Sequence, residues 1–312
     1  MRSPSSNLRR ARPLLGTLVE ITVSADFARA NDAIDCAFAA IERVHALMSF
    51  QDAGSDVARL NRAALAAPVA VDAHTFAVLA LAARVALVSD GAFDITVAPV
   101  LIGLGLLPAA GHAPPAHRRR GFELIELLPG ERVRFHAPLA IDLGGIAKGY
   151  AVDLAAATLE QEGVDAYVVN AGGDLRVGSA AERIHVRHPA RPARLLELAS
   201  IRCAAVATSA PYFVARDTGD SARHAVIAPE TGAPASYCGS ISVLAASCAT
   251  ADALTKVVAV LGRRAIPVLR HFEADACLLS VRGGWRRWPG HASHRHARRR
   301  RATDGVADTA SP

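Results

Sequence analysis

Residues 142–153 read DLGGIAKGYAVD, and this stretch says most about how the chain folds. An acid and two glycines follow an apolar run, and a lysine then opens a pattern with helical spacing. Paired glycines ahead of a helix let the backbone approach a ligand closely, and the free N–H groups of a helix start favour phosphate. Lysine is rare here, because of 35 Lys and Arg residues only Lys148 and Lys256 are lysines. Local spacing alone supports a plain strand-to-helix turn and a phosphate-binding turn equally, since neither a Walker A nor a G-x-G-x-x-G pattern is present.

Outward from this stretch, helix and strand patterns are mixed without the strict alternation of a doubly wound sheet, which predicts an α+β fold. Asp72 is a plausible N-cap for the helix expected over 72–91, which Gly91 would end, and Thr250 is the expected N-cap of another helix. Helices are expected over 30–49, 72–91, 145–163 and 250–262, with a short one within 51–64. Strands are expected over 16–25, 132–143, 166–178, 183–189, 195–209 and 239–247.

Composition and length limit the classes of protein to which this chain can belong. The chain has 312 residues, of which 51% are hydrophobic, so it can bury a sizeable core. No run of about 18 uncharged apolar residues is present, so we expect no transmembrane helix. Gly16, Thr17 and Glu20 interrupt the apolar part of the N-terminus, which therefore does not resemble a signal peptide. Since no lipid-attachment cysteine lies near the start, we expect a cytoplasmic protein, and a periplasmic one only if the true start lies upstream.

Three segments are expected along the chain: a flexible N-terminus over 1–11, one globular domain over 12–290 and a basic, disordered tail over 291–312. Residues 103–122 are rich in Gly, Pro and Arg and are expected to form an exposed connection. The five cysteines are odd in number and lack metal-like spacing. They predict reduced, mostly packed thiols and no zinc site.

Two other segments combine glycine with acids. In 170–178, NAGGDLRVG, a second glycine pair precedes an acid, and a hairpin turn capped by Asp174 is the simpler interpretation. In 90–99, DGAFDITVAP, we expect Phe93 to belong to the core. Asp94 has the chemistry to accept a hydrogen bond from a ring N–H or a hydroxyl.

The second lysine lies in 250–258, TADALTKVV, where Asp252 and Lys256 share one face of the expected helix. The simpler interpretation is an ordinary i,i+4 ion pair, worth about 0.2–0.5 kcal/mol. The functional interpretation makes Asp252 an oxygen ligand for Mg²⁺, which binds one or two carboxylates together with substrate phosphates. Both lysines therefore fall in segments suspected of handling phosphate.

Simple nucleophile schemes find no support, because G-x-S-x-G, H-E-x-x-H and S-x-x-K are all absent. Taken in order, the segments of this chain instead resemble the ApbE family, the FAD:protein FMN transferases. Each segment is weak alone, whereas the ordered set is specific and covers about residues 12 to 282. The matching segments are LLGTLVEITV, SFQDAGSDVARLN, DGAFDITVAP, DLGGIAKGYAVD, VNAGGDLRVG, VATSAPY, APETGAP and ADALTKVVAVLG.

The resemblance implies a single, T-fold-related unit with two lobes around a flavin cleft. It implies Mg²⁺-dependent transfer of FMN from FAD to a threonine hydroxyl of a target protein, with release of AMP. The carbonyl of Gly145 and the carboxylate of Asp252 would bind Mg²⁺, and Asp252 and Lys256 would be the catalytic residues. Asp142 and Asp174 would order the glycine turns. The implied FAD-binding residues are Leu15, Phe50, Ala92, Phe93, Asp94, Lys148 and Ile227.

The chain departs from the family pattern at several of these positions. Leu15 and Phe50 stand where methionine and tyrosine are usual, and both preserve the packing. Ala225 and Ala228 stand where a histidine and an acid are usual, which removes polar groups near the expected flavin site. Lys256 stands where threonine is common beside the metal. Its ammonium would either repel Mg²⁺ or supply part of the positive charge itself.

Four functions remain after the sequence alone. The first is the flavin transferase, and the second is an FAD diphosphatase that releases FMN and AMP to water at the same site. The third is a non-catalytic FAD-binding protein, because polar positions are missing. The last is nucleic-acid binding by the basic tail, which lies outside every matching segment.

Overall fold

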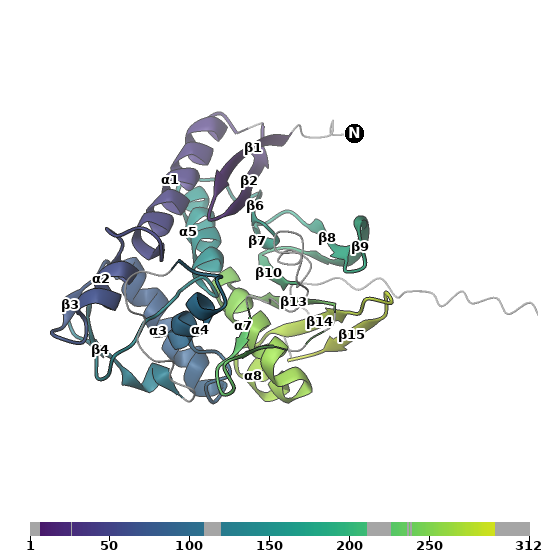
Figure 1. Cartoon of the computed structure of the whole chain (residues 1–312). Coiled ribbons are helices and arrows are strands. Elements are labelled where there is room, and N and C mark those ends of the chain that lie inside the picture. Colours follow the sequence, from purple (N-terminus) through teal and green to yellow (C-terminus); the bar gives the residue numbers. More distant parts are fainter. Residues whose placement is uncertain are drawn as a thin grey trace, which may run out of the picture.

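The computed structural model describes residues 7–25, 27–108, 120–210, 226–235, 237 and 239–290 (Figure 1). Its largest element is an antiparallel sheet that runs across the molecule. The strands are β1 (Asn7–Leu14), β2 (Thr17–Ser24), β6 (Tyr167–Ala171), β7 (Asp174–Val177), β10 (Ala204–Ser209), β13 (Ser240–Ala245), β14 (Asp275–Leu279) and β15 (Trp285–Trp288). They pair in the order β1-β2-β6-β7-β10-β13-β14-β15. The mixture of this sheet with helices confirms the α+β prediction.

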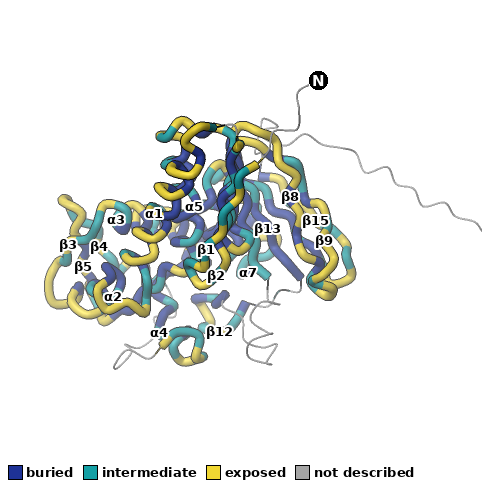
Figure 2. Tube along the Cα trace, turned by 90° about the horizontal axis from the view of Figure 1, so that it is seen from above, coloured by how far each residue is buried: buried dark blue, intermediate teal, exposed yellow. Residues whose placement is uncertain are grey.

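One face of the sheet is covered by helices. The helices at this face are α1 (Ala30–Met48), α5 (Ala147–Gln161) and α7 (Cys248–Leu261), and α3 (Ala73–Val88) packs against α1 and α7. In α1 the buried residues recur three and four apart, from Ala33 and Ile34 to Ile41 and Val44, which is the spacing of one helix face. Figure 2 shows the buried residues gathered where these helices meet the sheet.

The opposite face is covered in part by a hairpin of β8 (Glu182–His188) and β9 (Arg191–Ile201). Successive side chains of a strand point to opposite faces. In β10, Ala205 and Ala207 accordingly pack in the helix-side core, whereas Ala204 and Val206 pack in a second core beneath the hairpin. The sheet is therefore buried on both faces at its centre.

The stretch 142–153, which contains the first half of α5, packs directly against the start of α7. Gly149 lies so close to α7 that a Cβ there would be 2.4 Å from the carbonyl oxygen of Cys248, so no larger residue fits without movement. Asp153 accepts hydrogen bonds from the backbone N–H groups of Cys248 (2.8 Å) and Ala249 (2.9 Å). A carboxylate at a helix start satisfies free N–H groups and the helix dipole. This stretch therefore fixes how α5 and α7 meet.

Smaller elements complete the fold. They are α2 (Asp56–Ala63), α4 (Ala98–Gly103), α8 (Ile266–His271), a sheet of β3 (Val69–Ala70), β5 (Arg132–Phe135) and β4 (Ile125–Leu128), and the pair β11 (Ile227–Ala228) and β12 (Ala233–Pro234). In the described ranges, no helix combines the length and the apolar character needed to cross a membrane.

Most predicted helices are confirmed, and Asp72 caps α3 by accepting from the backbone N–H of His74 at 2.9 Å. Three local predictions are wrong. The N-terminus expected to be flexible contributes β1, which begins at Asn7. The strand expected over 132–143 ends at Phe135. The N-cap of α7 is Ser247, whose hydroxyl accepts from the N–H of Thr250.

The thiol prediction is only partly correct. Among the four described cysteines, none forms a disulfide. Cys248 and Cys277 are buried, whereas Cys36 and Cys203 are exposed. Cys238, the tail over 291–312 and residues 109–119 of the expected connection lie outside the described residues.

Candidate functional site: a cleft between α4, α5 and α7

A cleft of about 350 Å³ opens where the start of α5 meets α7 and the segment after α3. Its lining combines the glycine turn before α5, the turn between β6 and β7, the end of β10, β11, α4 and α7. Segments that are far apart in the sequence thus come together at one place. Six of the site residues that the family resemblance implied are among the residues of this lining. Those that line the cleft are Phe93, Asp94, Gly145, Lys148, Ile227 and Lys256.

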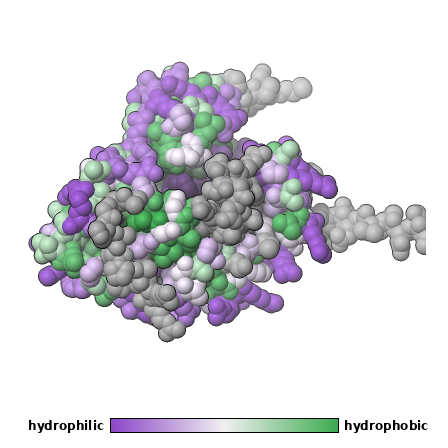
Figure 3. Space-filling view, viewed as in Figure 1, coloured by the Kyte–Doolittle hydropathy of each residue, from purple (hydrophilic) through white to green (hydrophobic). Residues whose placement is uncertain are grey.

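One wall of the cleft is apolar. Phe93 and Ile95 come from the segment after α3, and Leu101, Leu106 and Leu107 come from α4 and the turn that follows it. Figure 3 shows hydrophobic side chains gathered in the region of α4. Residues 103–108 therefore help to build the cleft, which corrects the prediction that this stretch is only an exposed connection. An aromatic ring beside aliphatic side chains suits a flat apolar ligand group.

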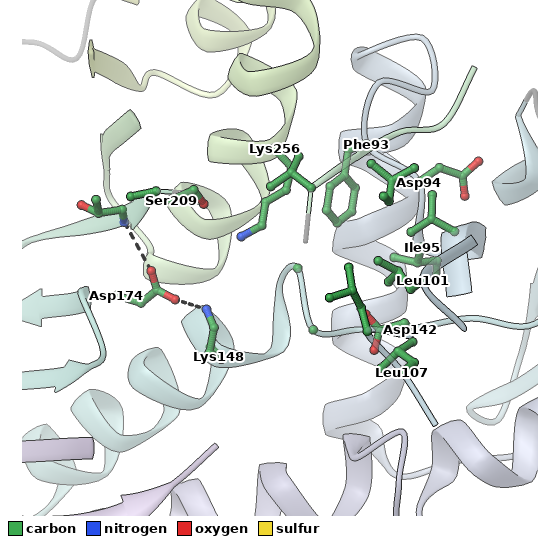
Figure 4. Close-up of a pocket in the computed structure, with 18 of the residues that line it drawn as sticks. Phe93, Asp94, Ile95, Leu101, Leu107, Asp142, Lys148, Asp174, Ser209 and Lys256 are labelled. Atoms are coloured by element: carbon green, nitrogen blue, oxygen red, sulfur yellow. Dashed lines mark hydrogen bonds and ion pairs between the residues drawn. The ribbon is translucent and has the colours of Figure 1, made fainter. Parts of the chain in front are cut away.

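Asp94 belongs to this wall but does not offer its carboxylate to the cleft. It caps the 3₁₀ helix η1 (Ile95–Val97) by accepting from the backbone N–H (2.9 Å) and the hydroxyl (2.8 Å) of Thr96. It also accepts from the N–H of Phe122 at 3.2 Å. Burial raises the pKa of Asp94 despite these bonds. Its oxygens face away from Lys148 and Lys256 (Figure 4), so its role here is structural.

The opposite wall carries four charged residues, which we call the lysine cluster: Lys148, Asp174, Asp252 and Lys256. Lys148 forms an ion pair with Asp174 and a longer one, at 3.4 Å, with Asp252 Oδ2. Lys256 forms an ion pair with Asp252 Oδ1. The side chains of Asp174 and Asp252 are 5% and 1% exposed, whereas those of Lys148 and Lys256 are 33% and 18% exposed. The carboxylates therefore lie behind, and the ammonium groups face the cleft (Figure 4).

The ion pairs set the protonation of the lysine cluster. Burial alone would raise the pKa of Asp252, but the nearby ammonium groups of Lys148 and Lys256 outweigh it and lower that pKa. Burial would lower the pKa of Lys148, but Asp174 and Asp252 raise it. Burial and the charge of Asp252 raise the pKa of Asp174. At neutral pH the Lys148 ammonium and the Asp252 carboxylate are therefore charged.

The glycine turn before α5 forms the floor between the two walls. A Cβ on Gly145 would lie 3.4 Å from the ring of Phe93 and 3.6 Å from Cε of Lys256. Asp142 lines the cleft beside this turn and accepts from the N–H of Gly144. Burial raises the pKa of Asp142, although Gly144 and the charge of Lys256 oppose the shift. Asp142 orders its glycine turn as predicted.

Asp174, in contrast, does not cap the turn between β6 and β7. The side chain of Asn170 does so, because its Oδ1 accepts from the N–H of Gly173 at 2.9 Å. Asp174 is directed to Lys148 and to the N–H of Thr208, at 3.4 Å. The prediction that Asp174 caps the turn is therefore wrong, and Asp174 belongs to the charged wall.

Sequence reasoning missed the hydroxyl groups at the end of β10. The hydroxyl of Thr255 donates to the carbonyl of Asp252 at 2.7 Å, so Ser209 donates its own hydroxyl to Thr255, also at 2.7 Å. Thr208 and Ser209 both line the cleft. They lie in VATSAPY, which carried a family resemblance but no chemical signal of its own.

Three predicted FAD-binding residues are not brought into the cleft by their side chains. Leu15 lies in the turn between β1 and β2, and it lines a separate hollow with Pro13 and Leu18. Phe50 packs against the hydrophobic core, and Ala92 is a buried residue of that core. Ala225 lies outside the described residues.

The two expected Mg²⁺ ligands differ in how they fit this geometry. Among the described residues, the carbonyl of Gly145 accepts no backbone hydrogen bond, because the N–H of Gly149 donates to Asp252 Oδ2 at 3.2 Å instead. That carbonyl fits a metal. The carboxylate of Asp252 does not, since Lys256 bonds one oxygen and Lys148 and Gly149 bond the other. No group of three or more His, Cys, Asp and Glu side chains in the described ranges is arranged to hold a metal ion.

The fold and the cleft define a class of protein: an α+β protein with an antiparallel sheet, whose two central helices present ammonium groups opposite an apolar wall. Such a cleft suits an anionic ligand that carries a large ring. The chain belongs to the ApbE family, whose sequence profile matches residues 15–278.

Relatives of known name agree with this assignment. An FAD:protein FMN transferase of Vibrio cholerae is 31% identical over 260 residues, which cover 75% of this chain and 78% of the relative. The Treponema pallidum protein of the same name is 30% identical over 299 residues, which cover 84% of this chain and 81% of that relative. These relatives are enzymes.

Solved structures of the family have the same fold. The flavin transferase ApbE from Vibrio cholerae superimposes with a TM-score of 0.77 at 26% identity, covering 92% of this chain and 97% of that one. The ApbE protein from Thermotoga maritima gives a TM-score of 0.78 at 27% identity, covering 90% and 97%. The similarity extends over nearly the whole chain.

Proposed function

We propose that this protein transfers FMN from FAD to the hydroxyl of a threonine in a target flavoprotein, and that AMP is the leaving group. One observation carries the proposal: two ammonium groups face a cleft whose other wall is apolar, in a member of the ApbE family. FAD matches this arrangement, because its diphosphate is anionic and its isoalloxazine ring is flat and largely apolar.

The diphosphate binds between Lys148 and Lys256, and the flavin ring lies along the wall that contains Phe93. Each lysine ammonium has three N–H donors. Lys148 directs donors to Asp174 and Asp252, and Lys256 directs donors to Asp252 Oδ1 and the Asp252 carbonyl at 3.1 Å. Each ammonium therefore keeps one N–H for a phosphate oxygen.

In the transfer step, the threonine oxygen forms a bond to the phosphorus on the FMN side. The bond from that phosphorus to the bridging oxygen breaks, and AMP leaves with the electron pair. The hydroxyl proton is released as the new phosphoester forms. The ammonium groups of Lys148 and Lys256 stabilise negative charge on the phosphate oxygens and on the departing AMP, which is the main requirement of phosphoryl-type transfer.

Asp142 is the carboxyl group placed to accept that proton. Among the acids that line the described cleft, Asp94 is bonded to Thr96 and Phe122, and Asp174 to Lys148. Asp142 lines the cleft and accepts from the N–H of Gly144. A carboxyl whose pKa is raised by burial is a stronger base when ionised.

The proposal assigns no step to Mg²⁺. The predicted ligand Asp252 has donors on both carboxylate oxygens, so the residues as arranged do not fit the metal.

The test measures AMP and covalent flavin together. The protein is incubated with FAD and a flavoprotein domain that carries the acceptor threonine, and a Thr→Val variant of the acceptor is the matched control. We expect one AMP for each labelled acceptor, detected by in-gel flavin fluorescence, and no label on the control. Equal AMP and free FMN with either acceptor identifies a diphosphatase instead. Bound FAD without any AMP identifies a binding protein.

A further inference from the structure

The side chain of Lys256 lies beside both places expected to hold a metal, the glycine turn at Gly145 and the carboxylate of Asp252. It extends from α7 past the glycine turn, where its Cε would be 3.6 Å from a Cβ on Gly145. Its Nζ then bonds Asp252 twice, at the carboxylate Oδ1 and at the backbone carbonyl (3.1 Å). Figure 4 shows the Lys256 side chain extending away from Phe93, into the space between its helix and Lys148.

The remaining oxygen atoms of Asp252 are also engaged. Oδ2 accepts from the N–H of Gly149 at 3.2 Å and from Lys148 at 3.4 Å. The backbone carbonyl accepts from the hydroxyl of Thr255 at 2.7 Å. A divalent ion needs oxygen lone pairs directed at it. Here every Asp252 oxygen already faces a donor, and two of the donors carry positive charge.

The charges of the lysine cluster lead to the same conclusion. With both carboxylates ionised, two ammonium groups and two carboxylates sum to zero. A divalent cation would leave an excess of positive charge beside Lys256, and like charges at such distances repel. Without Lys256, the cluster would carry a net negative charge, which is the usual charge of a divalent cation site.

We propose that the Lys256 ammonium is a built-in substitute for the divalent cation, so that this chain binds the diphosphate of FAD without Mg²⁺. The inference rests on the proposed function, because it takes FAD as the ligand. The lysine is held on Asp252 by its i,i+4 position on α7 and directs its remaining N–H to the diphosphate. A cation that is part of a side chain does not have to be bound from solution, and it is present whenever the protein is folded.

The first arm of the test needs no FAD. Mn²⁺ is titrated into the purified protein, and bound metal is measured by the loss of the free Mn²⁺ electron paramagnetic resonance signal. We expect Lys256→Thr to bind Mn²⁺ at least about 10-fold more tightly than the parent, because the change frees Asp252 Oδ1 and adds a hydroxyl oxygen. Equal and tight Mn²⁺ binding by both proteins would overturn the inference.

The second arm measures FAD affinity by the change in flavin fluorescence, in EDTA and then in Mg²⁺. The parent should bind FAD with a dissociation constant that changes by less than about 2-fold between the two conditions. Lys256→Thr should bind about 10-fold or more weakly in EDTA, the loss expected for one charge-assisted contact, and should recover in Mg²⁺. A parent protein that needs Mg²⁺ to bind FAD contradicts the inference.

Lys256→Met is the matched control, because it removes the charge without supplying a hydroxyl. It should lose FAD affinity in EDTA and recover less in Mg²⁺ than Lys256→Thr does. Circular dichroism melting curves establish that each variant is folded. If no protein binds FAD in either condition, the proposed function fails, while the Mn²⁺ arm still decides whether Lys256 occupies a cation site.

Discussion

Helix α5 carries one polar cluster at its start and another further along, and the two clusters use different cations. The lysine cluster at its start faces the cleft. The second, which we call the arginine cluster, comprises Asp153, Glu160, Tyr167 and Arg176. In it, Arg176 bonds Asp153 and the carbonyl of Ala246, each at 3.0 Å, and Tyr167 donates to Glu160. Asp153 in turn binds two N–H groups at the start of α7.

The difference shows why lysine is reserved for two positions in this chain. A guanidinium forms several directional bonds in one plane, which suits a permanent link between helix and strand. An ammonium is a compact charge with three donors, and those of Lys148 and Lys256 face a cleft large enough for a ligand. We infer that the arginine cluster holds the fold together and that the lysine cluster binds the ligand.

Lys148→Met tests this comparison with the largest expected effect. The change removes the ammonium that faces the cleft and leaves Asp174 and Asp252 sharing Lys256. We expect AMP release from FAD to fall about 1000-fold, because a group that stabilises charge in the transition state is lost. Stability should also fall, by about 3 kcal/mol, since a buried carboxylate loses its partner. Steady-state AMP assays and urea unfolding measure the two effects.

Asp142→Asn has the next largest expected effect. The amide can still accept from Gly144, so the turn should keep its structure, but it cannot take a proton. We expect AMP release with acceptor to fall about 100-fold, as for the loss of a general base. In the parent, the base must be ionised and burial raises its pKa, so activity should rise with pH through a value above the usual aspartate range. An unchanged acid limb in the Asp142→Asn profile would assign the proton to another group.

Arg176→Met is the matched change in the arginine cluster. It deletes a cation that bonds Asp153 and the carbonyl of Ala246 but lies outside the cleft lining. Unfolding free energy should drop by about 2 kcal/mol, the scale of hydrogen bonds to charged groups. At a temperature where the variant is folded, turnover should stay within about 2-fold of the parent, because no donor to the diphosphate is lost. A large fall in turnover at full folding would break the distinction between the two clusters.

Tyr167→Phe should give the smallest effect and one that depends on pH. Burial and the hydrogen bond to Glu160 raise the pKa of Tyr167 from 10.0 to about 12. A group whose pKa is raised by folding stabilises the protein below its unfolded pKa, and the contribution disappears as pH rises through the folded pKa. The parent should therefore exceed the variant by about 1 kcal/mol at pH 8 and lose that advantage between pH 10 and 12. Urea unfolding midpoints across this range measure the difference.

Several parts of this account were accessible from the sequence because they depend on local spacing. Asp252 and Lys256 are four residues apart, so a helix places them on one face, and the structure pairs them. The glycine turn before Lys148 likewise follows from adjacent residues. Alternation along 17–24 predicts β2, because residues on one side of a strand meet the core.

Other parts depend on tertiary contacts that no local pattern encodes. One carboxylate oxygen of Asp94 accepts a hydrogen bond from the N–H of Phe122, which is distant in the sequence. The functional interpretation of Asp252 as a metal ligand changes because Lys148 arrives from another helix. Leu15 matches a family motif, but the turn between β1 and β2 directs it to a separate hollow. Sequence position fixed which residues were candidates, whereas packing decided which of them face the cleft.

The arrangement of the lysine cluster around FAD is tested most directly by a crystal structure of the protein with FAD, grown in EDTA. The account predicts phosphate oxygens within about 3 Å of Nζ of both Lys148 and Lys256, with the isoalloxazine ring against Phe93. A diphosphate bound elsewhere, with both ammonium groups still directed only at Asp174 and Asp252, would contradict it.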